Sequence, residues 1–162
     1  MLTKLGWEMS TLLDALKHSD MRVGTYFALN GCLTAWHMCD WLATALDNEN
    51  RWGDARQAMK VSTRDELIHA VLAQPPLAIC HQIANATKHV FLDRGYKPGY
   101  QATYAKLPVD EMGRQHGLFI ETPDGVEEIV WVLYRGYLWW ASTLKSLGYS
   151  VEPDAPIISV NR

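Results

Sequence analysis

Residues 21–47 decide the fold, and they read MRVGTYFALNGCLTAWHMCDWLATALD. The run contains no proline, and its apolar residues, among them Phe27, Leu42 and Leu46, recur at helical spacing. Asp20 immediately precedes the run and is a residue type that caps helix N-termini. We therefore predict one long helix over 21–47, against which the rest of the chain must pack.

Four further segments show the same helical spacing of apolar residues, and a fifth is ambiguous. The four are 3–18, 63–73, 76–91 and 125–147, and the ambiguous one, 51–61, has room for a short helical turn. Residues 117–122 read as a short strand and Pro123-Asp-Gly125 as a turn, which predicts a small β-hairpin near 117–125. The predicted fold class is all-α for the most part, an antiparallel bundle of four to five helices. We place a single helical domain at 1–149 and an extended C-terminal tail at 150–162.

Length and cysteine usage favour one domain in a reducing compartment. The 162 residues include no apolar run near the roughly 18 residues that span a bilayer, and the N-terminus lacks an apolar signal core. Cys32 and Cys39 lie seven residues apart on one predicted helix, about 10.5 Å, which exceeds the reach of a disulfide. With Cys80 they make an odd, sparse set. We expect reduced thiols, a cytoplasmic location and no membrane.

Aromatic content and charge distribution both bear on partners. The chain has seven Trp and seven Tyr, and large aromatic side chains anchor interfaces as well as cores, so we expect a homodimer. Net charge is −3, yet residues 51–106 carry +4 and the remainder −7. A phosphate-bearing ligand such as RNA could use the basic middle, or that excess is ordinary solvated surface.

A polar cluster, His37-Met-Cys-Asp40-Trp41, lies inside the long predicted helix. Asn30, Thr34, His37 and Trp41 advance by four, three and four residues, so they share one face. Asp40 is three residues from His37, close enough for its carboxylate to accept an imidazole N–H and raise the basicity of the ring. Polar groups thus follow a face that a bundle should bury.

A second polar cluster, Asn85-Ala-Thr-Lys88-His89, lies in the predicted helix over 76–91. His81 and Asn85 are four residues apart, and either Lys88 or His89 continues the same stripe. Packing of the two helices would bring a carboxylate, imidazoles, an amide and an ammonium into one partly buried place. This spot is the predicted site.

Acid–base chemistry is one interpretation of the two clusters. His89 would give or take a proton, while Lys88 and Asn85 would stabilise charge on a phosphate or an oxyanion. His37 and Asp40 would orient or relay that proton. These five residues are the candidate catalytic residues, and no cofactor is expected.

Two other interpretations stay open beside it. In one, the polar groups form a structural network whose hydrogen bonds fix the register of the helices. In the other, a metal is held by four side chains, but no recognised ligand set is complete. Those four are His37, Asp40, His81 and His89.

The segment 94–106 interleaves cations with aromatic rings. That mixture suits single-stranded nucleic acid, because bases stack on the rings and cations follow the phosphates. A tyrosine-rich loop packed on the bundle would have the same composition. The candidate ligand-binding residues are Trp41, His81, Arg94, Tyr96, Lys97 and Tyr100.

The order His37-x-x-Asp40-Trp41, then Asn85-x-x-Lys88-His89, resembles a group of uncharacterised bacterial and phage helical proteins that are similar to the HEPN superfamily. The resemblance covers roughly residues 20–147. It implies a small helical bundle, usually a dimer, with metal-independent ribonuclease activity in defence, toxin or RNA-processing systems.

The resemblance assigns His89 to the histidine of the family motif. That motif has an arginine four to six residues before the histidine, and here Ile83, Ala84 and Asn85 stand in those places. Lys88 is the nearest cation, although an ammonium does not replace a guanidinium in phosphate recognition. We therefore predict two alternative functions. One is RNA binding or metal-free cleavage, and the other is that of a non-catalytic dimeric interaction protein with a structural polar network.

Overall fold

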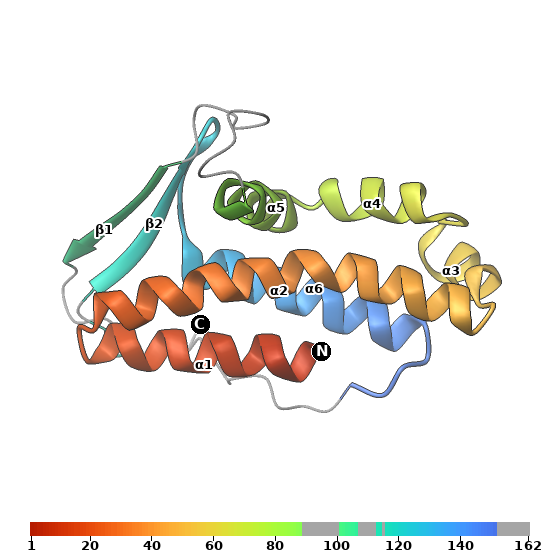
Figure 1. Ribbon diagram of the computed structural model, residues 1–162, viewed down its shortest axis with the longest axis horizontal. Helices are drawn as coiled ribbons and strands as arrows, with labels where there is room; N and C mark the ends of the chain where they lie inside the picture. Colours follow the sequence, from red (N-terminus) through yellow and green to blue (C-terminus); the bar gives the residue numbers. More distant parts are fainter. Residues whose placement is uncertain (89–100, 107–112, 115, 152–162) are drawn as a thin grey trace, which may run out of the picture.

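The computed structural model describes residues 1–88, 101–106, 113–114 and 116–151 (Figure 1). Its described part is mostly helical, with one small antiparallel sheet. The elements run in the order α1 (Leu2–Lys17), α2 (Met21–Asn48), α3 (Trp52–Met59), α4 (Arg64–Leu72), α5 (Pro75–Lys88), β1 (Gln101–Lys106), β2 (His116–Thr122), β3 (Gly125–Glu128) and α6 (Ile129–Ser146).

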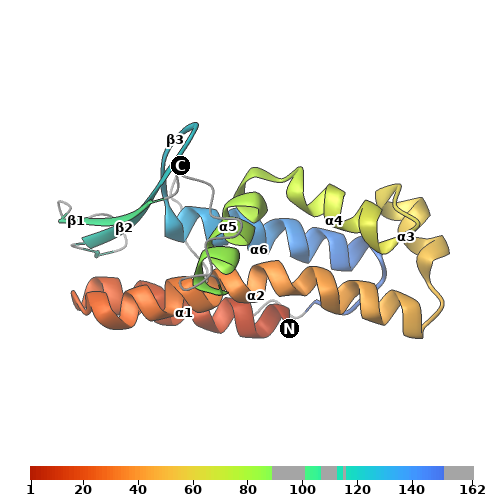
Figure 2. The ribbon, with the colours of Figure 1, turned by 45° about the horizontal axis from the view of Figure 1, so that its top comes forward.

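The long helix α2 is the common partner of the other helices. It packs against α1 along one side and against α5 and α6 on others, as Figures 1 and 2 both show. The short helices α3 and α4 lead the chain from the end of α2 back to α5. The prediction of one long helix over 21–47 is confirmed, with a single further residue at its C-terminal end.

Side-chain caps set where two of the helices begin. Asp20 accepts a hydrogen bond from the backbone N–H of Val23 at 3.1 Å and opens α2. Thr63 accepts from the N–H of Glu66 at 3.2 Å and opens α4, and the Glu66 carboxylate accepts from the N–H of Ser62. The ambiguous stretch 51–61 holds the two-turn helix α3.

The sheet differs from the sequence prediction at both of its edges. Strand β2 and the turn at 123–125 occur where they were expected, and β2 pairs with β1 on one side and β3 on the other. Strand β1 was not predicted, because the sequence analysis placed a strand only at 117–122, followed by the turn.

The prediction that a helix begins at residue 125 was wrong. Gly125 has φ +139°, a conformation that excludes a helical start, and Val126 to Glu128 pair with β2 instead. Glu128 also forms a buried ion pair with Arg114, which ties the strand down. Helix α6 therefore begins at Ile129.

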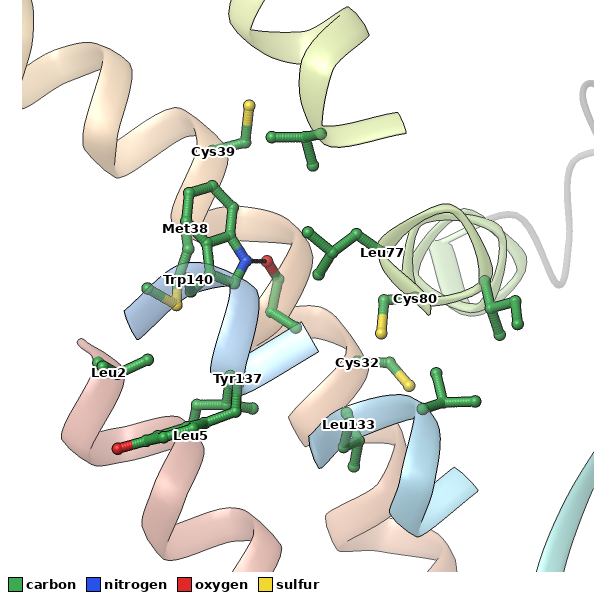
Figure 3. Packing of buried hydrophobic residues seen from close by; sticks show 14 of the residues in the cluster. Leu2, Leu5, Cys32, Met38, Cys39, Leu77, Cys80, Leu133, Tyr137 and Trp140 are labelled. Carbon is green, nitrogen blue, oxygen red and sulfur yellow. Dashed lines mark hydrogen bonds between the residues drawn. The ribbon is translucent and has the colours of Figure 1, made fainter. Parts of the chain in front are cut away.

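The core lies between α1, α2, α5 and α6, as the close-up in Figure 3 shows. Trp140 is fully buried, and its indole N–H donates to the backbone carbonyl of Ala35 at 2.9 Å, joining α6 to α2. Leu77 of α5 and Leu133 of α6 fill the space beside it. The fold is thus centred on α2.

Two glycines on α2 differ in what surrounds them. A Cβ added at Gly31 would lie 2.8 Å from Leu133 Cδ1, so this glycine allows α6 to approach α2 closely. A Cβ added at Gly24 would lie 3.5 Å from Leu16 Cδ2, an ordinary contact. Neither has a positive φ, so the difference is steric alone.

We predict opposite effects for alanine at these two glycines. Gly24→Ala should raise the free energy of unfolding by roughly 0.5–1 kcal/mol, because alanine loses less backbone entropy in a helix. Gly31→Ala should lower it by about 1–3 kcal/mol, because Leu133 is fully buried and has no room to move. Urea unfolding followed by circular dichroism measures both. Stabilisation by Gly31→Ala would contradict the close approach of α2 and α6.

Candidate functional site

The predicted site residues fall into described and undescribed groups. On α2, His37 is half-buried, whereas Asp40 and Trp41 are exposed. On α5, His81 and Asn85 are half-buried. The remaining predicted residues, His89, Arg94, Tyr96, Lys97 and Tyr100, lie outside the described residues, as does the side chain of Lys88.

Where α2 packs against α5 lies a small set of half-buried side chains that we call the interior polar cluster: Trp36, His81 and Asn85. The ring centroids of Trp36 and His81 are 4.1 Å apart, at an interplanar angle of 45°. The Asn85 side-chain amide is hydrogen-bonded to His81 Nε2 at 2.8 Å. A polar pair on α5 therefore stacks against an aromatic ring of α2.

The contact between α2 and His81 is made by a different residue from the one predicted. The sequence placed His37 on the polar face of α2, but the ring that contacts His81 is that of Trp36. One position along a helix rotates the side chain by about 100°, so the two neighbours face different directions. The sequence signal for Trp36 was its place in the apolar periodicity.

His37 and Asp40 do not make the bond that their spacing allows. No hydrogen bond or ion pair joins these two described residues, and Asp40 faces solvent. The backbone carbonyl of Asp40 accepts from Thr44 Oγ1 at 2.8 Å, and Arg64 of α4 donates to that hydroxyl at 3.3 Å. A tautomer-fixing carboxylate for His37 is therefore absent from the described part of α2.

The chemistry open to the interior polar cluster is limited. Its imidazole stacks on an indole and its Nε2 is occupied by an amide, so the ring is held in place by packing. Across residues 1–88, 101–106, 113–114 and 116–151, no three His, Cys, Asp or Glu side chains gather to hold a metal ion. The arrangement favours positioning of α5 on α2.

All three cysteines are free and buried. A hydrogen bond with Cys80, together with burial, raises the pKa of Cys32 well above its usual value. Burial raises the pKa of Cys39 to about 12, the Asp40 carboxylate adds to the rise, and Arg64 opposes it. Thiols with raised pKa values are poor nucleophiles at neutral pH, so neither Cys32 nor Cys39 suits covalent catalysis.

A second buried polar group escaped the sequence analysis. Glu8 is 2% exposed at the α1–α2 contact, where its Oε1 pairs with Lys4. The same ammonium donates to Thr34 Oγ1 at 2.5 Å, while Glu8 Oε2 has no hydrogen-bond partner among the described residues. The i, i+4 spacing of Lys4 and Glu8 was the available signal, but it is typical of exposed helix faces.

An open hollow of about 630 Å³ lies between α3 and the start of α4. Arg56 and Lys60 line it, and neither forms an ion pair with a described residue. The Glu66 carboxylate also borders the hollow, but its Oε2 is bound to the N–H of Ser62. We call this feature the basic hollow; it falls within the positively charged middle of the chain.

The outer face of α1 and α2 carries a group of aromatic side chains that we call the aromatic patch: the exposed Trp7 and Tyr26, and the half-buried Phe27. Trp7 is 60% exposed and Tyr26 61%. Both rings pack edge-on against Phe27, with centroids 5.3 Å apart in each pair. Arg22 lies four residues before Tyr26 on the same face and has no ion-pair partner among the described residues.

No family model, curated protein or solved structure matches this chain. The HEPN resemblance therefore remains a prediction. In the described part of the chain, no helix by itself has the length and apolarity to cross a membrane, whereas the pair Trp52–Leu72 and Pro75–Ala86, bent by 98°, meets both criteria together.

We predict that the interior polar cluster contributes to stability. Asn85→Ala should lower the free energy of unfolding by about 1–3 kcal/mol, because His81 loses a partner in a half-buried place. Gln82→Ala is the matched control on the same helix: Gln82 is also half-buried, has no side-chain hydrogen bond to a described residue, and should change stability by less than about 0.5 kcal/mol. Equal effects in urea unfolding would remove the structural role of the Asn85–His81 bond.

Proposed function

We propose that this chain is an antiparallel helical bundle that acts as a non-catalytic protein-interaction module. The observation that carries the proposal is the aromatic patch, where two large rings are more than half exposed beside an arginine without a described ion-pair partner. Trp, Tyr and Arg are the residue types that dominate binding energy at protein interfaces.

The contrast between this patch and the interior polar cluster supports the proposal. The Asn85 amide is hydrogen-bonded to His81 Nε2 across one turn of α5, and the ring of Trp36 packs against the imidazole. These contacts hold the imidazole in place, which agrees with a structural network. The exposed rings of Trp7 and Tyr26, by contrast, have apolar surface left to bury.

The composition of the patch defines the chemistry of its partner. An apolar surface on a second protein would cover Trp7 and Tyr26, and a carboxylate at its edge would pair with Arg22. The edge-on packing of both rings on Phe27 limits their rotamers before binding, which reduces the entropy that binding costs.

Photo-crosslinking in the source cell tests this proposal. A benzophenone amino acid at Tyr26 should give a discrete protein adduct, and Trp7→Ala in the same chain should weaken that adduct at least fivefold. The same photo-reactive residue at Gln57, in the basic hollow, is the control and should give no such adduct. Crosslinking of Tyr26 to RNA alone, or no adduct at either position, would contradict the proposal.

RNA binding is the second candidate, and the basic hollow is the observation that favours it. Arg56 and Lys60 are exposed there without described ion-pair partners, as phosphate-binding side chains would be. In this alternative the chain is a HEPN-like protein that binds or cleaves RNA in a bacterial or phage defence or regulatory setting.

Fluorescence anisotropy with a labelled single-stranded RNA tests the second candidate. If the basic hollow binds RNA, Arg56→Glu with Lys60→Glu should weaken binding about tenfold or more at low salt, because two cations contribute to counterion release. Lys17→Glu, a single charge reversal at an exposed position on α1, is the control, and the two variants are compared per charge reversed. Loss of affinity that is the same per charge at both places would exclude the hollow as a specific site.

A further inference from the structure

A stripe of five residues on the outward face of α6 has a spacing that reads the same from either end. The α6 stripe is Trp131, Tyr134, Leu138, Ser142 and Lys145, separated by three, four, four and three residues. Such spacing puts all five on one helix face. Leu138 at the centre is 47% exposed, Ser142 and Lys145 are exposed, and the two rings are half-buried.

We propose that the α6 stripe binds a second copy of this chain, antiparallel, with the two-fold axis passing beside Leu138. In this arrangement each residue of the stripe meets the residue placed equally far on the other side of the centre. The inference goes beyond the proposed function, because it concerns another surface and does not depend on the partner at the aromatic patch.

The pairs made by this symmetry are chemically complementary. Trp131 and Lys145 each lie seven residues from Leu138, so the ring of one copy faces the ammonium of the other in a cation–π contact, formed twice. Tyr134 and Ser142 each lie four residues from the centre, so two hydroxyls that can exchange a hydrogen bond also meet twice. No ion pair with a described residue competes for Lys145.

Charge also selects the antiparallel direction. In a parallel pair, Lys145 would lie against the partner's Lys145, and Arg135 against the partner's Arg135. In the antiparallel pair the two ammonium groups are 14 residues apart along the helix axis, about 21 Å, well beyond a Debye length at physiological salt. Arg135 keeps its own ion pair with Glu127 at 2.6 Å. The stripe is thus complementary to itself in one direction only.

The size of the stripe sets the expected strength of the dimer. A strip about 21 Å long and roughly 10 Å wide covers about 210 Å², which is less than the roughly 800 Å² that each partner buries in a standard interface. Area alone does not fix affinity, but an interface of this size typically belongs to a weak or transient complex. We therefore expect a dimer with a dissociation constant in the micromolar range or weaker.

Disulfide crosslinking tests the position of the axis directly. A residue beside a two-fold axis meets its own copy, so Leu138→Cys should form a covalent dimer on mild oxidation with copper phenanthroline. Lys145→Cys should not, because the two copies of that residue are about 21 Å apart. Val126→Cys, an exposed apolar position at 65% on β3, is the control for random collision. The three native thiols are buried and serve as the wild-type background.

Sedimentation velocity over about 5–500 µM supplies the second measurement. The wild type and Val126→Glu should both show concentration-dependent dimerisation, while Leu138→Glu should remain monomeric with an unchanged melting temperature, because residue 138 faces solvent in the free chain. A monomeric wild type over that range would overturn the inference. So would a dimer that survives Leu138→Glu, or covalent dimers that form equally well from all three cysteine variants.

Discussion

The hydrogen bond from the Trp140 indole to the Ala35 carbonyl fixes how α6 lies on α2, and the other helices depend on that pair. A buried indole N–H needs an acceptor, so this bond holds the largest side chain of the core in one orientation. Leu133, seven residues earlier on α6, then presses into the space left by Gly31. With the axis of α2 fixed in this way, α1 packs on one side and α5 on the other. The outward faces of α1, α2 and α6 expose large apolar side chains that other molecules could cover.

The helices could be predicted from the sequence to the extent that local rules determine them. Apolar spacing and the cap at Asp20 gave α2 nearly to the residue, and the predicted segment 63–73 contains α4. Local rules did not reveal that residues 125–128 continue a sheet. Helical spacing does extend back to Val126, but pairing with β2 satisfies the backbone there and a positive φ at Gly125 prevents a helix from starting. Strand β3 has only four residues, and its one apolar residue, Val126, also fits the helical spacing of the segment that follows, so spacing alone does not separate the two structures.

The candidate site could be predicted only by region. The sequence placed a polar meeting point where α2 packs on α5, and His81 with Asn85 is part of it. It selected His37 as the partner, yet the contact is made by Trp36, because the rotation of α2 about its axis is set by tertiary packing and not by spacing alone. The predicted bond between His37 and Asp40 does not form for a related reason. Their spacing permits a contact, but Asp40 faces solvent, and an exposed carboxylate gains little free energy from pairing. Glu8 was missed because Lys4 lies four residues before it, a spacing of charged residues that is typical of exposed helix faces.

The contacts that hold the molecule together are distinct from the surfaces that it presents to other molecules. We propose that the interior polar cluster is structural and that no catalytic centre is built on it. The most direct measurement is cleavage of single-stranded RNA by the wild type and by His89→Ala, with EDTA present, across pH 5–9. We predict no cleavage by either protein above that of a buffer control. Cleavage by the wild type that persists in EDTA and disappears in His89→Ala would contradict this prediction and would establish a metal-free ribonuclease.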